Sequence, residues 1–506
     1  MKMVKSLILG SAAGLIAMSG AQAADLPVKA KAVEYVKICS LYGAGFWYVP
    51  GTDTCIKLGG YLRVDTTLNG GVYDRPAWSG NDGQGNRLAD SYQSRSRMAF
   101  TIDTRTATEY GVVRTFGQAD IQYTSPDGTV ASSGYPTGSG VGVEQVFIQF
   151  AGFTFGKSQS AYSTPWHGYP GNNTSYLMGG HDSVTGVNNI QYTAQFGNGV
   201  SGSIGLDDSS VYNRTSVYNL STGLSAAGTT GNAYGGNEYP DIVANVRIDQ
   251  AWGLFQLSGA LHRVNASYNT LTAGTAAANS LSEISGHPDS KWGGSVMAAL
   301  LIRNLPTGRG DDFKIDATYA KGDTKNVIST SASSPSFAMF SGSSRDGAYQ
   351  SVGFGATTDA VYLPGSTDGL KLTTAYGIRG AFNHNWDPNW STSLFGSYSA
   401  VRYDGSVGDL SSAKGAYCAT YAASNAGAKS ADYSCNPDYN VAQLGVVTRW
   451  TPVKNLTFSA EAQWFHLDQM FTGTSVLGAA SPKPTTVYEY KDQDTYSLNL
   501  RVQRNF

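Results

Sequence analysis

The sequence predicts an all-β chain that closes into a sixteen-stranded antiparallel transmembrane β-barrel. Three observations support this fold class: a glycine- and aromatic-rich composition, strands in which apolar and polar residues alternate, and connections that alternate between short and long. Outer-membrane barrels combine alternating strands with tight turns at one end and longer loops at the other. A soluble β-sandwich has no reason to alternate its connections so regularly.

The composition excludes several other classes of protein. Of 506 residues, 61 are glycine, 12% are aromatic and only 14% are charged, whereas globular domains average about 25% charged residues. The formal net charge of −2 argues against a nucleic-acid-binding protein, which would carry a basic patch. A disordered tail would need more charge, and a coiled coil far more Glu, Lys and Leu. The length alone suggests about three domains, but a barrel can run this long as one domain.

The N-terminus reads as a secretory signal peptide over residues 1–23. Lys2 and Lys5 form the positive start, residues 7–18 the short apolar stretch, and residues 21–23 a small-residue cleavage site. The apolar run is too short to span a bilayer, and no later segment approaches 18 consecutive apolar residues. A buried N-terminal helix is the alternative interpretation. We therefore expect export and no transmembrane helix.

Four cysteines occur as two close pairs. Because an exported chain enters an oxidising compartment, disulfides are favoured over metal ligands. Four cysteines allow three connectivities, and we expect the short-range ones, Cys39–Cys55 and Cys418–Cys435. No C-x-x-C motif occurs and the six histidines are scattered singly, so we expect neither a metal site nor a cofactor.

The C-terminus shows the clearest strand. From Tyr496 onward, apolar and polar residues alternate, which is typical of a strand with one apolar and one polar face. One strand fits a soluble sandwich or a membrane barrel, but the whole set favours a barrel. Strands are expected over residues 56–68, 95–105, 112–123, 143–151, 153–158, 187–195, 200–208, 240–249, 254–264, 291–302, 313–321, 371–384, 390–403, 440–450, 456–468 and 494–506.

The connections between these strands alternate in length. The short turns are 106–111, 196–199, 250–253, 387–389 and 451–455. The long polar stretches are 69–94, 124–142, 159–186, 209–239, 265–290, 404–439 and 469–493. The segment 322–370 contains strand-like pieces around 350–354 and 360–363. If those pieces join the wall, the barrel has eighteen strands.

The side chains of the expected strands separate into a lipid face and a lumen face. The outward set is Leu58, Leu62, Val64, Met98, Phe100, Ile102, Ile242, Val246, Ile248, Leu372, Tyr376, Ile378 and Phe382. Tryptophans lie at or near the strand ends, where they form an aromatic girdle or, alternatively, pack in a core. They are Trp252, Trp386, Trp390, Trp450 and Trp464. The lumen set is Gln118, Asp120, Gln122, Asn245, Arg247, Asp249, Thr457, Ser459, Glu461 and Gln463. A polar interior of sixteen strands leaves an aqueous channel.

Several motifs resemble those of the alphaproteobacterial general porins, the outer-membrane porins of the rhizobial and Brucella type. They are residues 33–39 (VEYVKIC), 42–46 (YGAGF), 50–55 (PGTDTC), 60–63 (GYLR), 150–157 (FAGFTFGK) and the terminal Phe506. The resemblance runs over the mature chain and is strongest at its two ends and around residues 145–158. This chain is longer than that family leads us to expect, with the surplus in external loops.

The resemblance implies a trimeric, water-filled diffusion channel in the bacterial outer membrane. It implies a signal peptide over 1–23, a periplasmic or lumenal segment over 24–55 and a barrel over 56–506, with Phe506 as an assembly signal. The implied partners are outer-membrane lipid and lipopolysaccharide, further copies of the chain, the barrel-assembly machinery, and small hydrophilic solutes and ions. Nucleic acid is not among them.

A porin performs no chemistry, and the sequence shows no catalytic motif. No G-x-S-x-G, H-E-x-x-H or P-loop occurs. The glycine-rich residues 138–142 precede an expected strand rather than a helix, so they do not form a phosphate loop. We expect a protein that is not an enzyme.

By resemblance, the third long loop, residues 159–186, folds into the lumen and forms a constriction. Its candidate residues are Tyr162, Trp166, His167, Tyr169, Tyr176, His181 and Asp182. Asp182 is the only carboxylate of the loop, whereas inward loops of such porins are rich in acids, so a transverse field is in doubt. His167 and His181 also fit the role of ordinary polar loop residues.

The first strands supply basic residues to the expected lumen. They are Lys57, Arg63, Arg95, Arg97, Arg105 and Arg114, with the acids Asp65, Asp103 and Asp120 among them. Clustered arginines focus a field across a wet lumen and would favour anions. Alternatively, the arginines pair with the three aspartates and only hydrate the wall.

Two further functions fit the same sequence. One is a substrate-specific channel in which the aromatic residues of 159–186 guide a solute. The other is a secreted β-rich adhesin or lectin, which would be extracted without detergent, whereas lipid-facing stripes predict insolubility in its absence.

Overall fold

The computed structural model describes residues 37–71, 81–125, 139–181, 184–210, 214–271, 280–331, 334–364, 369–478 and 482–506. The expected signal peptide and Asp182 lie outside these residues. Within the described ranges, no helix is long and apolar enough to cross a membrane.

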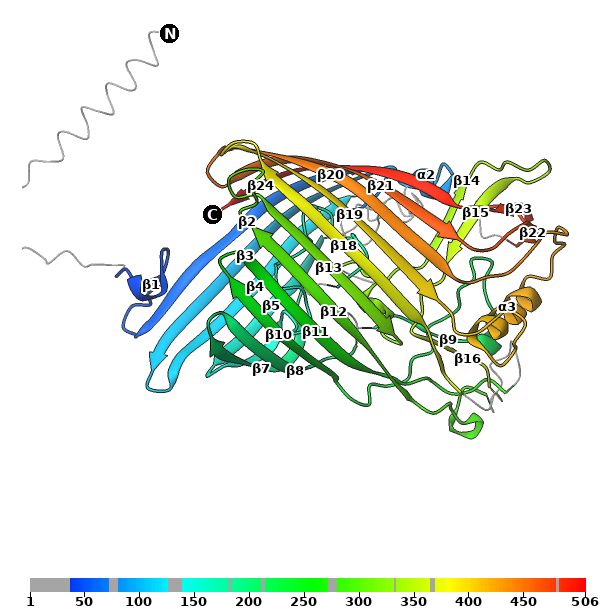
Figure 1. The fold of residues 1–506 in the computed structure, drawn as a ribbon, viewed down its shortest axis with the longest axis horizontal. Helices are drawn as coiled ribbons and strands as arrows, with labels where there is room; N and C mark the ends of the chain where they lie inside the picture. The colour runs from blue at the N-terminus through cyan, green and yellow to red at the C-terminus, as the bar shows by residue number, and fades with distance from the viewer. Residues whose placement is uncertain are drawn as a thin grey trace, which may run out of the picture.

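Sixteen antiparallel strands form a closed ring, which confirms the predicted fold class (Figure 1). The ring closes because β2 pairs with both β3 and β24. Its strands are β2 (Thr54–Leu68), β3 (Tyr92–Thr108), β4 (Gly111–Ser125), β5 (Ser139–Phe150), β6 (Phe153–Ser158), β7 (Val187–Gly197), β8 (Val200–Asp207), β10 (Asp241–Gln250), β11 (Gly253–Val264), β12 (Lys291–Arg303), β13 (Asp312–Lys321), β18 (Thr374–Asn385), β19 (Trp390–Arg402), β20 (Tyr439–Val453), β21 (Leu456–Gln469) and β24 (Gln493–Asn505). Closure pairs the backbone groups of every strand, which a lipid environment requires.

The two faces of the wall differ as the alternation predicts. On β24, Tyr496 and Leu500 are exposed, whereas Thr495 and Asn499 are buried. The exposed members of the predicted outward set are Leu58, Leu62, Val64, Met98, Phe100, Ile102, Ile242, Val246, Tyr376 and Ile378. Leu372 is a wrong prediction, because it lies on β17 (Lys371–Leu372) outside the ring and packs half-buried against an apolar cluster.

Four of the five strand-end tryptophans mark the short-turn end of the barrel. Trp252 lies in the turn between β10 and β11, Trp386 and Trp390 flank the turn between β18 and β19, and Trp450 stacks on Trp390 at 5.8 Å between ring centroids. This is where an aromatic girdle meets a membrane interface. Trp464 instead lies within β21 and donates its indole hydrogen to Asp494 at 2.7 Å.

The strand-like pieces of 322–370 do not join the wall, so the eighteen-strand alternative is wrong. One small sheet consists of β14 (Phe337–Ser341), β15 (Gln350–Gly355), β23 (Thr486–Tyr490) and β22 (Thr474–Leu477). Another consists of β17, β16 (Ala360–Tyr362) and β9 (Val217–Asn219). The remaining elements are β1 (Trp47–Tyr48), α2 (Asn81–Gln84), α3 (Ala413–Ser424) and the 3-10 turns Ser40–Tyr42, Leu220–Thr222, Glu283–Ser285 and Thr324–Asn326.

An apolar core fills one side of the barrel at the long-loop end. Inward side chains of the wall, Val401 and Phe465, belong to the same buried cluster as Val327, Phe337 and Phe354 from the segment 322–370. Helix α3 adds to this cluster and is joined to the following loop by the disulfide Cys418–Cys435. The long loops on this side therefore fold inward and pack, rather than extending into solvent.

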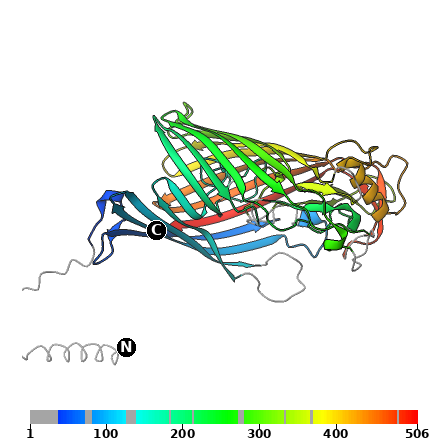
Figure 2. The same cartoon turned by 90° about the horizontal axis from the view of Figure 1, so that it is seen from below.

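The N-terminal segment projects from the opposite end (Figure 2). Strand β1 pairs with the first residues of β2, and the disulfide Cys39–Cys55 lies in a small core with Phe46. Pairing of β2 with β3 begins at Thr54, but pairing of β2 with β24 begins only at Tyr61. The ribbon of β2 and β3 thus extends beyond the end of β24.

Candidate functional site

The inward loop connects β6 to β7 and packs against the inner face of the wall. Its first part places Tyr162 and Trp166 in a buried cluster with Val243 of β10 and Met297 of β12. Asn245 donates to the carbonyl of Ala161 at 2.6 Å. Because Val243 and Asn245 belong to the inward set of β10, the loop lies within the barrel.

The tip of the inward loop is fastened by one carboxylate of β21. Backbone amides of Asn173 and Thr174, together with the Thr174 hydroxyl, donate to Glu461, which is 1% exposed. Asn173 also donates to the hydroxyl of Ser459 at 2.8 Å. Hydrogen bonds to a charged acceptor are roughly twice as strong as neutral ones. Glu461 therefore holds the tip against the wall.

The next residues of the loop are clamped by side chains of β20 and β18. Gln443 accepts from the amide of Met178 at 2.8 Å and donates to the carbonyl of Tyr176 at 3.0 Å. Arg379 donates to the carbonyl of Leu177 at 3.2 Å and pairs with Asp316 at 3.0 Å. Side chains of the wall thus form the hydrogen bonds to the loop backbone that a neighbouring strand would otherwise provide.

Lys157, the last residue of the motif 150–157 that precedes the inward loop, joins the two ends of the loop. The ammonium of Lys157 donates to carbonyls on both sides, those of Val143 and Glu144 on β5 and that of Thr185 at the loop's end. The preceding Gly156 has φ +123°, and a Cβ there would lie 2.4 Å from the carbonyl oxygen of Val146. Gly156 is therefore required by the close approach to β5, and Lys157 by the carbonyl groups that it bridges.

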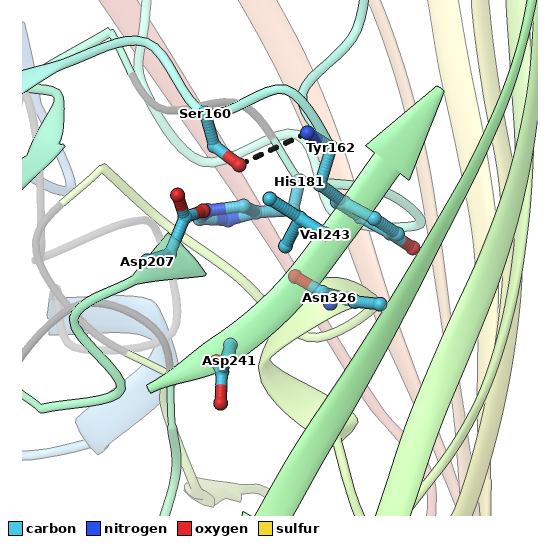
Figure 3. Close-up of a pocket in the computed structure, with 8 residues that line it drawn as sticks. Ser160, Tyr162, His181, Asp207, Asp241, Val243 and Asn326 are labelled. Carbon is cyan, nitrogen blue, oxygen red and sulfur yellow. Dashed lines mark hydrogen bonds between the residues drawn. The ribbon is translucent and has the colours of Figure 1, made fainter. Parts of the chain in front are cut away.

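Both ends of the inward loop meet in one buried pocket (Figure 3). Ser160 accepts from the amide of Tyr162 at 3.0 Å, and His181 contacts the hydroxyl of Ser329 at 3.0 Å. Asp207 and Asp241 line the same pocket. Burial lowers the pKa of His181 well below its usual value of 6.5, and the charges of Lys325 and Arg379 lower it further. His181 is therefore neutral at neutral pH.

The structure divides the predicted loop residues into two groups. Tyr162, Trp166, Tyr176 and His181 are all less than 8% exposed and fasten the loop. Among the described members of this set, only His167 is exposed, and Tyr169 is half-buried with its hydroxyl donating to the carbonyl of Ser175. The buried rings of Tyr162, Trp166 and Tyr176 are therefore not available to a solute, whereas Tyr169 lines a cavity.

The predicted basic residues of β2–β4 also divide into buried and solvent-accessible side chains. Arg95 and Arg97 are buried at 1% and 8% exposure, Arg63 is half-buried on Gln503, and Lys57 is exposed. Arg105 and Arg114 keep side-chain exposures of 30% and 28%.

Three aspartates of the wall are each shared by two arginines. The first, Asp65, pairs with Arg95 at 2.5 Å and with Arg501 at 2.6 Å, and it is buried. The triplets, written with the shared aspartate in the middle, are Arg95–Asp65–Arg501, Arg105–Asp103–Arg114 and Arg247–Asp249–Arg303. Asp120 differs, since it and Glu144 pair with the single Arg97. Each triplet carries a surplus positive charge.

Sequence reasoning did not predict the partners of several of these residues. Asp249 and Glu461 belong to the predicted lumen set, and Arg501 lies on the polar face of β24. Their partners Arg303, Thr174 and Asp65 lie on distant segments. Arg303 follows the alternation of β12, whereas Glu144 is the extra residue of a bulge in β5. Nothing in local spacing indicates which inward residue will meet the loop.

A closed barrel with an apolar outer face, a charged inner face and an inward loop defines a bacterial outer-membrane channel protein. The chain belongs to the porin family: the family model described as "Porin subfamily" matches residues 25–499. This membership confirms the resemblance found in the sequence and places the chain in the outer membrane. Family and relatives indicate a channel rather than an enzyme.

The chain is similar to porin Omp2b of Brucella abortus and of Brucella melitensis, at 36% identity over 259 residues. That alignment covers 49% of this chain and 63% of the relative, so the chain spans less than two thirds of the relatives it matches. Among solved structures, the outer-membrane channel DcaP of Acinetobacter baumannii shares the fold, with a TM-score of 0.54, 13% identity, and coverage of 91% of this chain and 99% of that one.

Proposed function

We propose that this chain forms a water-filled channel through which small hydrophilic solutes and ions diffuse passively, and that it catalyses no reaction. The observation that carries the proposal is the charged inner wall that solvent still reaches. Side chains of Arg105, Arg114, Arg247 and Arg303 are 28% to 36% exposed although they face inward. A packed barrel interior would not leave guanidinium groups in contact with water.

The accessible triplets further support a preference for anions. Asp103 and Asp249 each compensate one of two arginines, so solvent at the short-turn end of the channel meets net positive charge. Arginine keeps its charge throughout the physiological pH range. The inward loop, fastened along β10, β18, β20 and β21, narrows the lumen in which this field acts.

The same proposal includes the partners that family membership suggests. These are further copies of the chain in a homotrimer, lipopolysaccharide around the apolar wall, and a barrel-assembly machinery that reads the C-terminus. The terminal Phe506 exchanges backbone hydrogen bonds with Gly60 and is 60% exposed, as a terminal recognition residue requires.

Planar-bilayer recording of the purified, detergent-folded protein tests the proposal. We expect stepwise chloride and potassium currents, steps grouped in threes, and a reversal potential in a salt gradient with the sign of anion preference. Absence of conductance from correctly folded protein would overturn the channel. A reversal potential of the opposite sign would overturn the anion preference alone.

A further inference from the structure

The charges that solvent reaches on the inner wall at the short-turn end of the barrel are predominantly positive. The triplets around Asp103 and Asp249 lie on β3–β4 and on β10–β12, and each carries one surplus arginine. Lys57 adds an exposed ammonium beside the first triplet, since it is the cross-strand neighbour of Asp103. Because short turns face the periplasm in outer-membrane barrels, the periplasmic mouth of the channel is positive.

The long-loop end carries exposed carboxylates at the rim of the barrel. Asp289 lies two residues before β12 and Asp404 two residues after β19, and both side chains are exposed. Other exposed carboxylates in the described parts of the long loops are Glu238, Glu283, Asp346, Asp409, Asp432 and Asp492. The exposed cations of the same segments are fewer, namely Arg87, Arg345 and Lys491. The external mouth of the channel is therefore negative.

Two cations at the long-loop ends of the strands belong to the outer surface of the barrel. The guanidinium of Arg263 lies 5.4 Å from the ring centroid of Trp292, and that of Arg402 lies 5.7 Å from the ring centroid of Tyr376. Both rings are exposed on the outward face of the wall. These two arginines therefore do not compensate the carboxylates that solvent meets at the entrance.

Ion pairs of the wall between the two mouths are buried. Arg97 with Asp120, and Arg379 with Asp316, are all at most 8% exposed. Their charges compensate each other and are withdrawn from passing ions. The accessible charge of the channel thus changes from positive at the periplasmic mouth to negative at the external mouth.

We propose that the opposite charges of the two mouths make the channel rectify, so that it passes more current when the periplasmic side is negative. Anions gather at the positive mouth and cations at the negative mouth, because fixed charge concentrates its counter-ions. With the periplasmic side negative, the voltage drives both kinds of ion towards the middle of the channel and raises its conductance. The opposite voltage draws both kinds of ion out and lowers it. The inference rests on the proposed channel function and adds a direction to it.

Recording in dilute and in concentrated potassium chloride tests the proposal. The screening length is about 30 Å at 0.01 M salt and about 3 Å at 1 M, so the charged mouths act across the channel only in dilute salt. At 0.01 M, we expect conductance about twofold higher with the periplasmic side negative, and equal conductance at both polarities at 1 M. A polymer-linked maleimide too large for the pore identifies the external side, because it reacts with Asp404→Cys from that side alone.

Two double variants separate the placement of charge from the amount of charge. Asp289→Asn/Asp404→Asn removes two carboxylates at the external rim, and Asp53→Asn/Glu109→Gln removes two at exposed turns of the periplasmic end. Both variants change the net charge equally. The first should lower the ratio of the two conductances towards one, and the second should raise it above the wild-type ratio.

The outcomes distinguish rectification from the channel itself. A channel that conducts equally at both polarities in dilute salt, or that rectifies in the opposite direction, overturns the inference and leaves the proposed function intact. A change of the same sign in both double variants also overturns it, because net charge and not its placement would then set the ratio. A folded protein without any conductance overturns the proposed function.

Discussion

Glu461 and Thr174 lie 287 residues apart in the sequence, yet both the amide and the hydroxyl of Thr174 donate to the Glu461 carboxylate. The contact joins the tip of the inward loop to β21. Because this carboxylate is almost fully buried, the loop and the wall form one packed unit.

Glu461→Gln should loosen the tip of the loop. The amide keeps the shape of the side chain but loses the charge of the acceptor, which costs about 2 kcal/mol of anchoring. We expect larger open-channel current noise and a higher mean conductance in planar bilayers. Glu238→Gln, on the external side and 38% exposed, is the control and should behave as wild type. Unchanged noise in Glu461→Gln would contradict the anchoring role.

Asp65→Asn should lower the stability of the barrel. Removal of this carboxylate leaves Arg95 and Arg501 facing each other in a buried site, and breaking such a pair costs about 3–5 kcal/mol. Resistance of the folded barrel to heat in detergent, followed by its gel mobility, measures the loss. Asp53→Asn, on an exposed turn before β2, should leave that resistance unchanged.

Asp249→Asn should change selectivity rather than stability. The side chain is 38% exposed, and exposed ion pairs contribute only about 0–1 kcal/mol. Arg247 and Arg303 are then uncompensated, so the reversal potential in a salt gradient should move towards stronger anion preference. The double variant Arg247→Gln/Arg303→Gln should move it the other way. A shift of equal sign in both proteins would exclude this triplet from the conducting lumen.

Acidification should release the inward loop through His181. Its pKa in the folded protein lies below the value of 6.5 that it has in an unfolded chain, so the released loop binds the proton more readily. The stabilisation is complete above pH 6.5 and is lost as the pH falls below it. Current noise should therefore rise below pH 6 in wild type but not in His181→Gln. His167→Gln, at an exposed position, should keep the wild-type pH response.

Loss of the Cys418–Cys435 bridge should affect the external core and spare the barrel. The bridge closes a loop of 17 residues, for which removal costs roughly 3 kcal/mol. In Cys418→Ser/Cys435→Ser, we expect protease cleavage within residues 404–439 while the barrel still migrates as a folded species. Cleavage of β-strand segments instead would show that the bridge supports the whole fold.

Local alternation was sufficient to predict the wall, since each strand must separate a lipid face from a lumen face. It could not assign 350–354 and 360–363, because a strand buried on both faces and a half-buried wall strand are hard to distinguish over so few residues. The inward loop was predicted from resemblance, but its fastening by Gln443 and Arg379 depends on contacts between segments more than 200 residues apart. Pairing of the first-strand arginines with Asp65, Asp103 and Asp120 was one of two alternatives in the sequence, whereas the sharing of Asp65 with Arg501 joins residues more than 400 positions apart.

The apolar core at the long-loop end occupies one side of the barrel entrance. Val401 and Phe465 face inward, yet they meet Phe337 and Phe354 instead of water. Inward side chains of β13, β18, β19, β20 and β21 are thus packed as in the interior of a globular domain. Deletion of residues 334–364 to widen the pore would expose the apolar side chains of the wall inside the barrel. We expect the shortened protein to aggregate instead of conducting more current.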